Sequence, residues 1–194
     1  MAPGRRARAA LATALAAALL LIEAAPSVRH GFAGNEYAVF AIPAPSAAVH
    51  ANGRLEEAVL AWINRQRADR GLPLLQPNRM MRDAARAYGL DMFAHGYLSH
   101  VSRGGRTLQD RLAGLGLSFG IVGENLAYAP DIEEAEQALW QSQPHRRNML
   151  YAAFRVIGIG VIDGGDGVIV VQDFADEPSR DSTAARRAGG SAAR

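Results

Sequence analysis

Two histidines and one glutamate are the residues of this chain whose types and places could support chemistry. His100 and His145 each follow a predicted helix, in stretches where loops leave rigid elements, and Glu124 lies between Gly123 and a run of apolar residues. An unpaired buried charge is costly, so a carboxylate in an apolar run needs a partner. Two imidazoles could supply that partner directly or through a bound cation. His100, Glu124 and His145 are therefore the candidate site.

Three kinds of chemistry are compatible with these residues. Imidazole and carboxylate groups are ligands for zinc and similar divalent cations, although the spacing matches no HExxH-type motif. Glu124 could act as the base of a metal-assisted hydrolase with the two histidines as metal ligands. A hydrogen-bonded cluster that only orders three loops would satisfy the same groups without any reaction.

The composition excludes several other classes of protein. The chain has no cysteine, which leaves no disulfide framework, thiolate metal site or cysteine nucleophile. Residues 52–176 carry 13 arginines against 15 acidic residues, whereas the flanks carry 8 arginines against 4 acidic residues. The basic character thus belongs to the flanks, and the central part has no excess of positive charge to bind nucleic acid.

The N-terminus has the layout of a secretory signal peptide. Three arginines, Arg5, Arg6 and Arg8, precede an apolar run from Ala9 to Ile22, and small residues follow it. A spanning helix needs roughly 20 apolar residues, and this run is shorter. We therefore expect residues 1–27 to be a cleaved signal and the protein to be secreted, periplasmic or in the cell envelope. An uncleaved signal is the one route by which we expect it to be held at a membrane.

Composition divides the rest of the chain into three parts. Residues 28–51 mix proline, glycine and alanine without a sustained period, which predicts a linker. Residues 177–194 are polar with almost nothing to bury, which predicts a disordered tail. Residues 52–176 are left as one folded domain, the size that a chain of this length supports.

Four helices are predicted to position the candidate site. Apolar residues recur at helical spacing, and Asn, Thr or Asp stands where an N-cap is needed. The predicted helices begin near Leu55, after Asn78, after Thr107 and after Asp131, and the last three end near Gly96, Ala113 and Trp140.

The last third of the domain changes from helical to strand character. Phe154–Ile162 and Val168–Phe174 are rich in valine and isoleucine, and a glycine-rich turn separates them, so they predict a β-hairpin. Helices followed by paired strands, with no repeated βαβ unit, indicate an α+β fold with an antiparallel or mixed sheet covered by helices.

Several segments in series resemble the CAP superfamily of cysteine-rich secretory proteins, antigen 5 and pathogenesis-related 1 proteins, in its small bacterial form with an SCP domain. The resemblance runs from Asn64 to Phe174. The most specific segments are Ser99-His100, Gly123 to Ala127, WQSQPHRRNML from Trp140 to Leu150, Ile157 to Val161, and Val171 to Phe174.

The resemblance implies an α-β-α sandwich with a cleft lined by two histidines and acidic residues. His100 matches the first cleft histidine, Glu124 the acid of the GEN motif, and His145 the second histidine. Animal members usually have a second cleft glutamate after the tryptophan, but Gln141-Ser142-Gln143 follows Trp140 here. A divalent cation such as zinc would be held less strongly by three ligands than by four.

The resemblance also implies an extracellular binding module, since some members bind sterols and lipids. The expected partner is a lipid or sterol, a glycan or a protein. A metal-assisted extracellular hydrolase and a structural interaction protein of the cell envelope remain alternatives. The missing second acid counts against the hydrolase.

Overall fold

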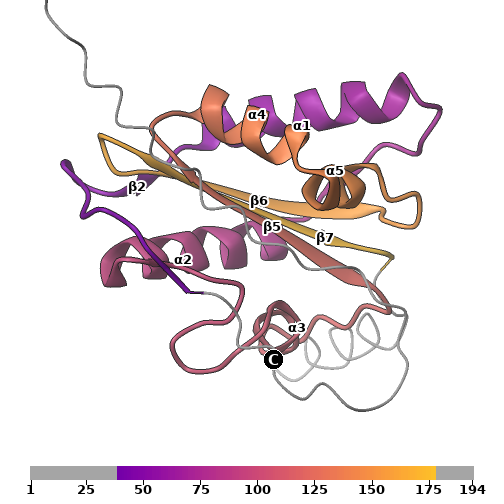
Figure 1. The fold of residues 1–194 in the computed structure, drawn as a ribbon. Coiled ribbons are helices and arrows are strands. Elements are labelled where there is room, and N and C mark those ends of the chain that lie inside the picture. The colour runs from indigo at the N-terminus through magenta and orange to yellow at the C-terminus, as the bar shows by residue number, and fades with distance from the viewer. Residues whose placement is uncertain (1–38, 178–194) are drawn as a thin grey trace, which may run out of the picture.

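The computed structural model describes residues 39–177, in which a central sheet lies between two layers of helices (Figure 1). The helices are α1 (Gly53–Ala68), α2 (Arg79–His95), α3 (Leu108–Ala113), α4 (Ile132–Gln141) and α5 (Gln143–Leu150). The strands are β1 (Phe40–Ala41), β2 (His50–Ala51), β3 (Gln76–Pro77), β4 (Tyr97–Leu98), β5 (Val122–Ala129), β6 (Val156–Asp163) and β7 (Val168–Ala175).

The main sheet is mixed. Its antiparallel part has the order β2-β6-β7-β5. β2 and β3 lie on the same edge of β6: β2 pairs with its end, and β3 pairs in parallel with its start. A separate two-stranded ladder joins β1 to β4. Helices α1, α4 and α5 cover one face of the main sheet, and α2 and α3 cover the other (Figure 1). The predicted α+β sandwich is confirmed.

Three helices begin at the predicted caps Asn78, Thr107 and Asp131, and α1 begins at Asn52, which was not predicted as a cap. The side chains of Asn52, Asn78 and Asp131 accept hydrogen bonds from the first backbone amides of α1, α2 and α4. Thr107 and Asp110 form a complete capping box at α3. These bonds satisfy amides that have no partner within the helix. α5 differs, because it begins without a side-chain cap hydrogen bond.

Close packing of α2 on the sheet depends on glycine in β6. A Cβ atom at Gly158 would lie 2.3 Å from the backbone carbon of Met81, and one at Gly160 would lie 2.7 Å from that of Ala85. The two glycines therefore let the backbone of α2 lie directly against β6. α2 leads into β4 and then to His100.

Three segments differ from the sequence prediction. Residues 39–51, expected to belong to a linker, contain β1 and β2 and pair with β4 and β6. β5 was not predicted, because its polar residues interrupt the apolar pattern. α5 was not predicted either, so His145 lies on a helix and not in a loop. The predicted signal, the first part of the linker and nearly all of the predicted tail lie outside the described residues.

The core lies on both faces of the sheet. One cluster packs β5, β6 and β7 against α1, α4 and α5, and a second packs the opposite face against α2. Within residues 39–177, no helix is both long and apolar enough to cross a membrane.

Candidate functional site

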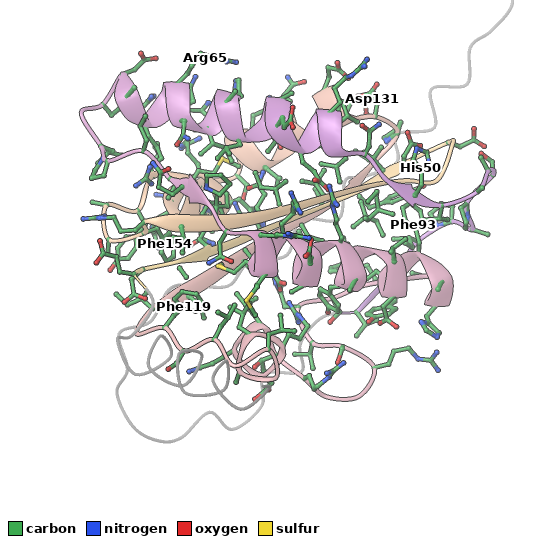
Figure 2. The ribbon with its side chains drawn as sticks, turned by 180° about the vertical axis from the view of Figure 1, so that it is seen from behind. His50, Arg65, Phe93, Phe119, Asp131 and Phe154 are labelled. Carbon is green, nitrogen blue, oxygen red and sulfur yellow. The ribbon has the colours of Figure 1, made fainter. Side chains whose placement is uncertain are left out.

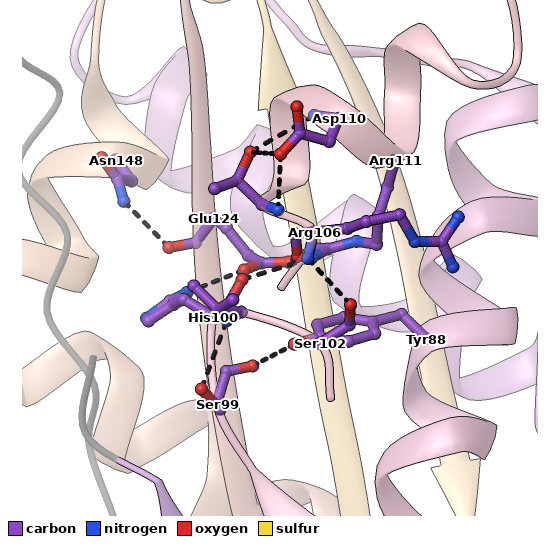
Figure 3. Close-up of polar contacts among 11 residues, drawn as sticks. Tyr88, Ser99, His100, Ser102, Arg106, Asp110, Arg111, Glu124 and Asn148 are labelled. Carbon is purple, nitrogen blue, oxygen red and sulfur yellow. Dashed lines mark hydrogen bonds and ion pairs between the residues drawn. The ribbon is translucent and has the colours of Figure 1, made fainter. Parts of the chain in front are cut away.

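The structure brings two of the three predicted residues into direct contact. His100 follows β4, Glu124 lies on β5, and His100 Nδ1 is 2.7 Å from Glu124 Oε1 (Figure 3). Both side chains are almost fully buried. The second oxygen of Glu124 accepts a hydrogen bond from Arg111 on α3. Among the described residues, one imidazole and one guanidinium hold the Glu124 carboxylate, and a site formed by all three predicted residues stays a prediction.

Arg111 links this pair to its surroundings. Its guanidinium donates to the carbonyl of His100 at 3.2 Å and lies over the ring of Tyr88, 3.6 Å from the ring centre. The Tyr88 hydroxyl donates to the carbonyl of Ser99. These contacts hold the His100 loop, α2 and α3 together (Figure 3). Burial raises the pKa of Tyr88 far above its ordinary value, so this phenol stays a neutral donor.

Asp173 is a second buried acid beside Glu124. It is the cross-strand partner of Glu124 in the β5–β7 register, and it is fully buried. Neither carboxylate oxygen of Asp173 has a hydrogen-bond partner among the described residues. Burial, followed by the charge of Glu124, raises the pKa of Asp173 well above its ordinary value. The raised pKa favours the neutral form of Asp173 beside the ion pair that Glu124 makes with Arg111.

The other face of β5 carries a network of amide side chains. Asn125 Nδ2 donates to the carbonyl of His145 and to Gln172 Oε1, each at 3.0 Å. Asn148 Nδ2 donates to Asn125 Oδ1 at 2.9 Å. Because successive side chains of a strand point to opposite faces, Glu124 and Asn125 serve different faces of the sheet. Asn125 thereby fixes the backbone of α5, while the ring of His145 contacts Ser142 Oγ through Nδ1 at 2.7 Å.

The residues as arranged do not fit the predicted metal site. Within residues 39–177, no three His, Asp or Glu side chains are grouped so that they could hold a metal ion. Glu124 is also held by the positive charge of Arg111, which a cation would have to displace. A divalent cation at His100, Glu124 and His145 therefore stays a prediction from the sequence alone.

A cleft and a groove adjoin the His100–Glu124 pair. A small cleft of about 220 Å³ is lined by His100, Glu124 and their neighbours. A larger groove of about 840 Å³ runs between α2, the 102–106 loop and α3. Its lining residues are Met80, Asp83, Ala84, Ala87, Tyr88, Asp91, His95, Ser102, Arg103, Gly104, Arg106, Arg111 and Leu115. Arg111 lines the groove and contacts Glu124, which lines the cleft, so Arg111 lies between the groove and the cleft.

Sequence reasoning missed Arg111 and Asp173. A signal for Asp173 was present, because it is an acid in the apolar strand Val168–Ala175, the same pattern that singled out Glu124. Arg111 gave no such signal, since arginine in a short capped helix is ordinarily solvated.

Glu136 on α4 is a half-buried acid, and its surroundings predict a pH-dependent stability. Its Oε1 accepts a hydrogen bond from Gln172 Nε2 at 3.0 Å, and its Oε2 has no partner among the described residues. Burial raises the pKa of Glu136 to about 7, against the hydrogen bond from Gln172, which lowers it. A raised pKa means that folding disfavours the carboxylate, so stability should fall as the pH rises from about 4.5 to about 7.

Glu136→Gln is therefore expected to raise the free energy of unfolding by roughly 1–3 kcal/mol at pH 8. The gain should vanish at pH 4, where the folded and unfolded wild type both carry a neutral Glu136. Urea denaturation at the two pH values measures it, with the exposed Glu133→Gln on the same helix as the control. Equal stability of wild type and Glu136→Gln at pH 8 would contradict the prediction.

The sequence of the domain is similar to those of two curated bacterial proteins. The chain is 32% identical over 111 residues to the uncharacterized protein YkwD of Bacillus subtilis, a match that covers 57% of this chain and 43% of that protein. It is also 32% identical over 107 residues to the uncharacterized membrane protein YlbC of the same organism, covering 55% of this chain and 31% of that protein. The chain thus spans less than half the length of these curated relatives.

Solved structures share the fold. An extracellular protein containing an SCP domain from Bacillus anthracis is 28% identical with a TM-score of 0.59, and the match covers 64% of this chain and 41% of that one. An outer surface protein from Borrelia burgdorferi is 16% identical with a TM-score of 0.60, covering 67% of this chain and 99% of that one, which shows the fold alone. The model of the CAP family, described as the cysteine-rich secretory protein family, matches residues 60–174, more than half of the chain. This chain is therefore a member of the CAP family, in its cysteine-free bacterial SCP-domain form.

Proposed function

We propose that this protein is an extracellular binding module whose groove between α2 and the 102–106 loop takes a lipid with an anionic head group. An extracellular location is supported by the signal-like residues 1–27 and by the extracellular SCP-domain protein of Bacillus anthracis that the chain resembles.

The shape and apolar wall of the groove favour a lipid over a glycan. Its volume of about 840 Å³ is in the range of sites for small ligands. One wall is made of Ala84, Ala87 and Tyr88 on α2, and Leu115 after α3 is 42% exposed beside it. An alkyl chain gains free energy when it covers such a surface, whereas a polyhydroxylated sugar finds few partners there.

The observation that carries the proposal is the uneven pairing of charges around the groove. The acids on α2 are already engaged: Asp83 pairs with Arg79 and Arg82, and Asp91 contacts His95 and Tyr97. Arg103 and Arg106 on the facing loop are exposed and make no ion pair within residues 39–177. The groove therefore offers two guanidinium groups to an anion, and guanidinium suits phosphate and carboxylate oxygens.

The proposal predicts that head-group charge and tail length contribute separately. Dodecyl phosphate should bind the protein, as measured by calorimetric titration below the concentration at which it forms micelles. Arg103→Gln/Arg106→Gln should weaken its binding about tenfold or more, because each charged hydrogen bond contributes roughly 1.5–3 kcal/mol. Dodecyl maltoside, which has the same tail and no charge, should bind more weakly and be unaffected by that double variant.

Two controls separate the groove from the rest of the surface. Ala87→Trp should weaken both probes, because the indole fills the space along the α2 wall. Arg65→Gln, on the exposed side of α1, should change neither. Absence of binding by both probes, each tested up to the concentration at which it forms micelles, would rule the proposal out. Equal binding of dodecyl phosphate to wild type and the double variant would rule out the head-group site.

The other predicted functions lack a comparable observation. A metal-assisted hydrolase would need the Glu124 carboxylate, which is already ion-paired with Arg111. A structural role in the cell envelope and a protein or glycan ligand stay predictions from the family resemblance.

A further inference from the structure

We infer that the lipid of the proposed function has two acyl chains, with its phosphate at Arg103 and one chain in a hollow on each side of that residue. This inference rests on the proposed function, because it names the kind of lipid that the same site takes. The first hollow is the groove between α2 and the 102–106 loop. The second hollow lies beside the ladder of β1 and β4 and has a volume of about 540 Å³.

This second hollow, the β1–β4 hollow, offers apolar surface to a ligand. It is lined by Val39, which precedes β1, by Tyr97 on β4 and by Val101. Val39 is 66% exposed, and Val101 is partly exposed. The volume is within the range of sites for small ligands. An acyl chain that covers the two valines gains free energy, because apolar surface on both sides leaves water.

The two hollows meet at one place in the loop. His95, Ser102 and Arg103 line both of them. Of these two hollows, Val101 lines only the β1–β4 hollow, and Arg106 lines only the groove. The chain therefore passes from one hollow to the other at Ser102 and Arg103.

Hydrogen bonds within the loop hold this junction in place. The Ser102 amide donates to the carbonyl of Arg106 at 3.0 Å, and the Gly105 amide donates to the carbonyl of Ser102 at 2.8 Å. The Arg106 amide donates to Ser102 Oγ at 3.1 Å. Gly105 has a φ of +77°, in the left-handed region that favours glycine. A loop closed in this way leaves less conformational entropy to be lost when a ligand binds.

The charge at the junction matches the head of a two-chain lipid. Arg103 is exposed and makes no ion pair within residues 39–177. A cation thus stands between two apolar hollows, and a guanidinium suits phosphate oxygens. In a phospholipid with two chains, the phosphate is joined to the glycerol from which both chains leave. A lipid with one short chain would fill one hollow and leave the other to water.

A matched pair of lipids tests this inference. Hexanoyl-glycerol-3-phosphate and dihexanoyl-glycerol-3-phosphate have the same phosphate and differ by one acyl chain. In calorimetric titrations below the micelle concentrations, the two-chain lipid should bind the wild type about tenfold or more tightly than the one-chain lipid, because its second chain also leaves water. Equal affinities would overturn the inference.

Variants of the β1–β4 hollow locate the second chain. Val101→Trp, which fills the hollow, should remove the advantage of the two-chain lipid, and Val39→Ser on its exposed rim should reduce it. Both variants should bind the one-chain lipid as the wild type does, which shows that the groove is intact. Arg65→Gln should change neither affinity, since Arg65 lies on α1, on the opposite side of the sheet from α2 (Figure 2). An advantage that survives both valine variants would place the second chain elsewhere and contradict the inference.

Dodecyl phosphate separates this inference from the proposed function. If dodecyl phosphate binds but a second acyl chain adds nothing, the proposed function stands and the inference fails. If neither dodecyl phosphate nor the glycerol phosphates bind, both fail. If Val101→Trp weakens dodecyl phosphate as much as it weakens the two-chain lipid, one long tail runs through both hollows and the two-chain inference is wrong.

Discussion

Replacement of Arg67 by methionine is expected to lower the free energy of unfolding by about 3–5 kcal/mol, because it leaves several buried carbonyls without a donor. The Arg67 side chain is fully buried at the end of α1. Its guanidinium donates to the carbonyls of Pro73, Met149, Tyr151 and Phe154 at distances of 2.8 to 3.2 Å. It thereby joins α1 to the end of α5 and the start of β6.

Urea denaturation of Arg67→Met and of Arg65→Met measures this effect. Arg65 is exposed two residues earlier on the same helix, so its replacement should change the free energy of unfolding by less than about 0.5 kcal/mol. Burial lowers the pKa of Arg67 from its ordinary value, and the nearby charge of Arg155 adds to this effect. The guanidinium remains a cation held by carbonyl dipoles. A loss below about 1 kcal/mol would mean that water replaces these hydrogen bonds.

Replacement of Arg111 by methionine is expected to cost about 3 kcal/mol, because it removes the positive charge that balances Glu124. Glu124 would then lie beside Asp173 in the sheet, and among the described residues its carboxylate would keep His100 as its one side-chain partner. Arg111→Met/Glu124→Gln should recover part of the loss, since the second change removes the stranded charge.

The double-variant cycle distinguishes this electrostatic effect from lost packing. If the stacking of Arg111 on Tyr88 were its main contribution, Glu124→Gln would add to the loss instead of reducing it. Arg106→Met, in the loop that precedes α3, serves as the exposed control. Thermal unfolding and urea denaturation should rank the stabilities of wild type, the two single variants and the double variant in the same order.

Local signals in the sequence predicted the parts of the fold that depend on neighbouring residues. The caps at Asn78, Thr107 and Asp131 start helices because each side chain bonds an amide two or three residues away. The Val- and Ile-rich segments form the β6–β7 hairpin because a short glycine turn joins them. β5 and α5 were missed because their polar residues are satisfied by distant partners, as Asn125 is by Gln172 and Asn148.

Only the tertiary structure decided how the candidate site is composed. The sequence by itself determined that His100 and Glu124 are unusual, since a carboxylate in an apolar run requires a partner. It could not identify Arg111 as that partner, because α3 reaches β5 only when the chain is folded. The sheet register set Asp173 beside Glu124, and the alternation of side chains placed Asn125 on the opposite face. Neither the pairing of Asp173 with Glu124 nor the face of Asn125 can be predicted from spacing along the chain, because both depend on which strands become neighbours.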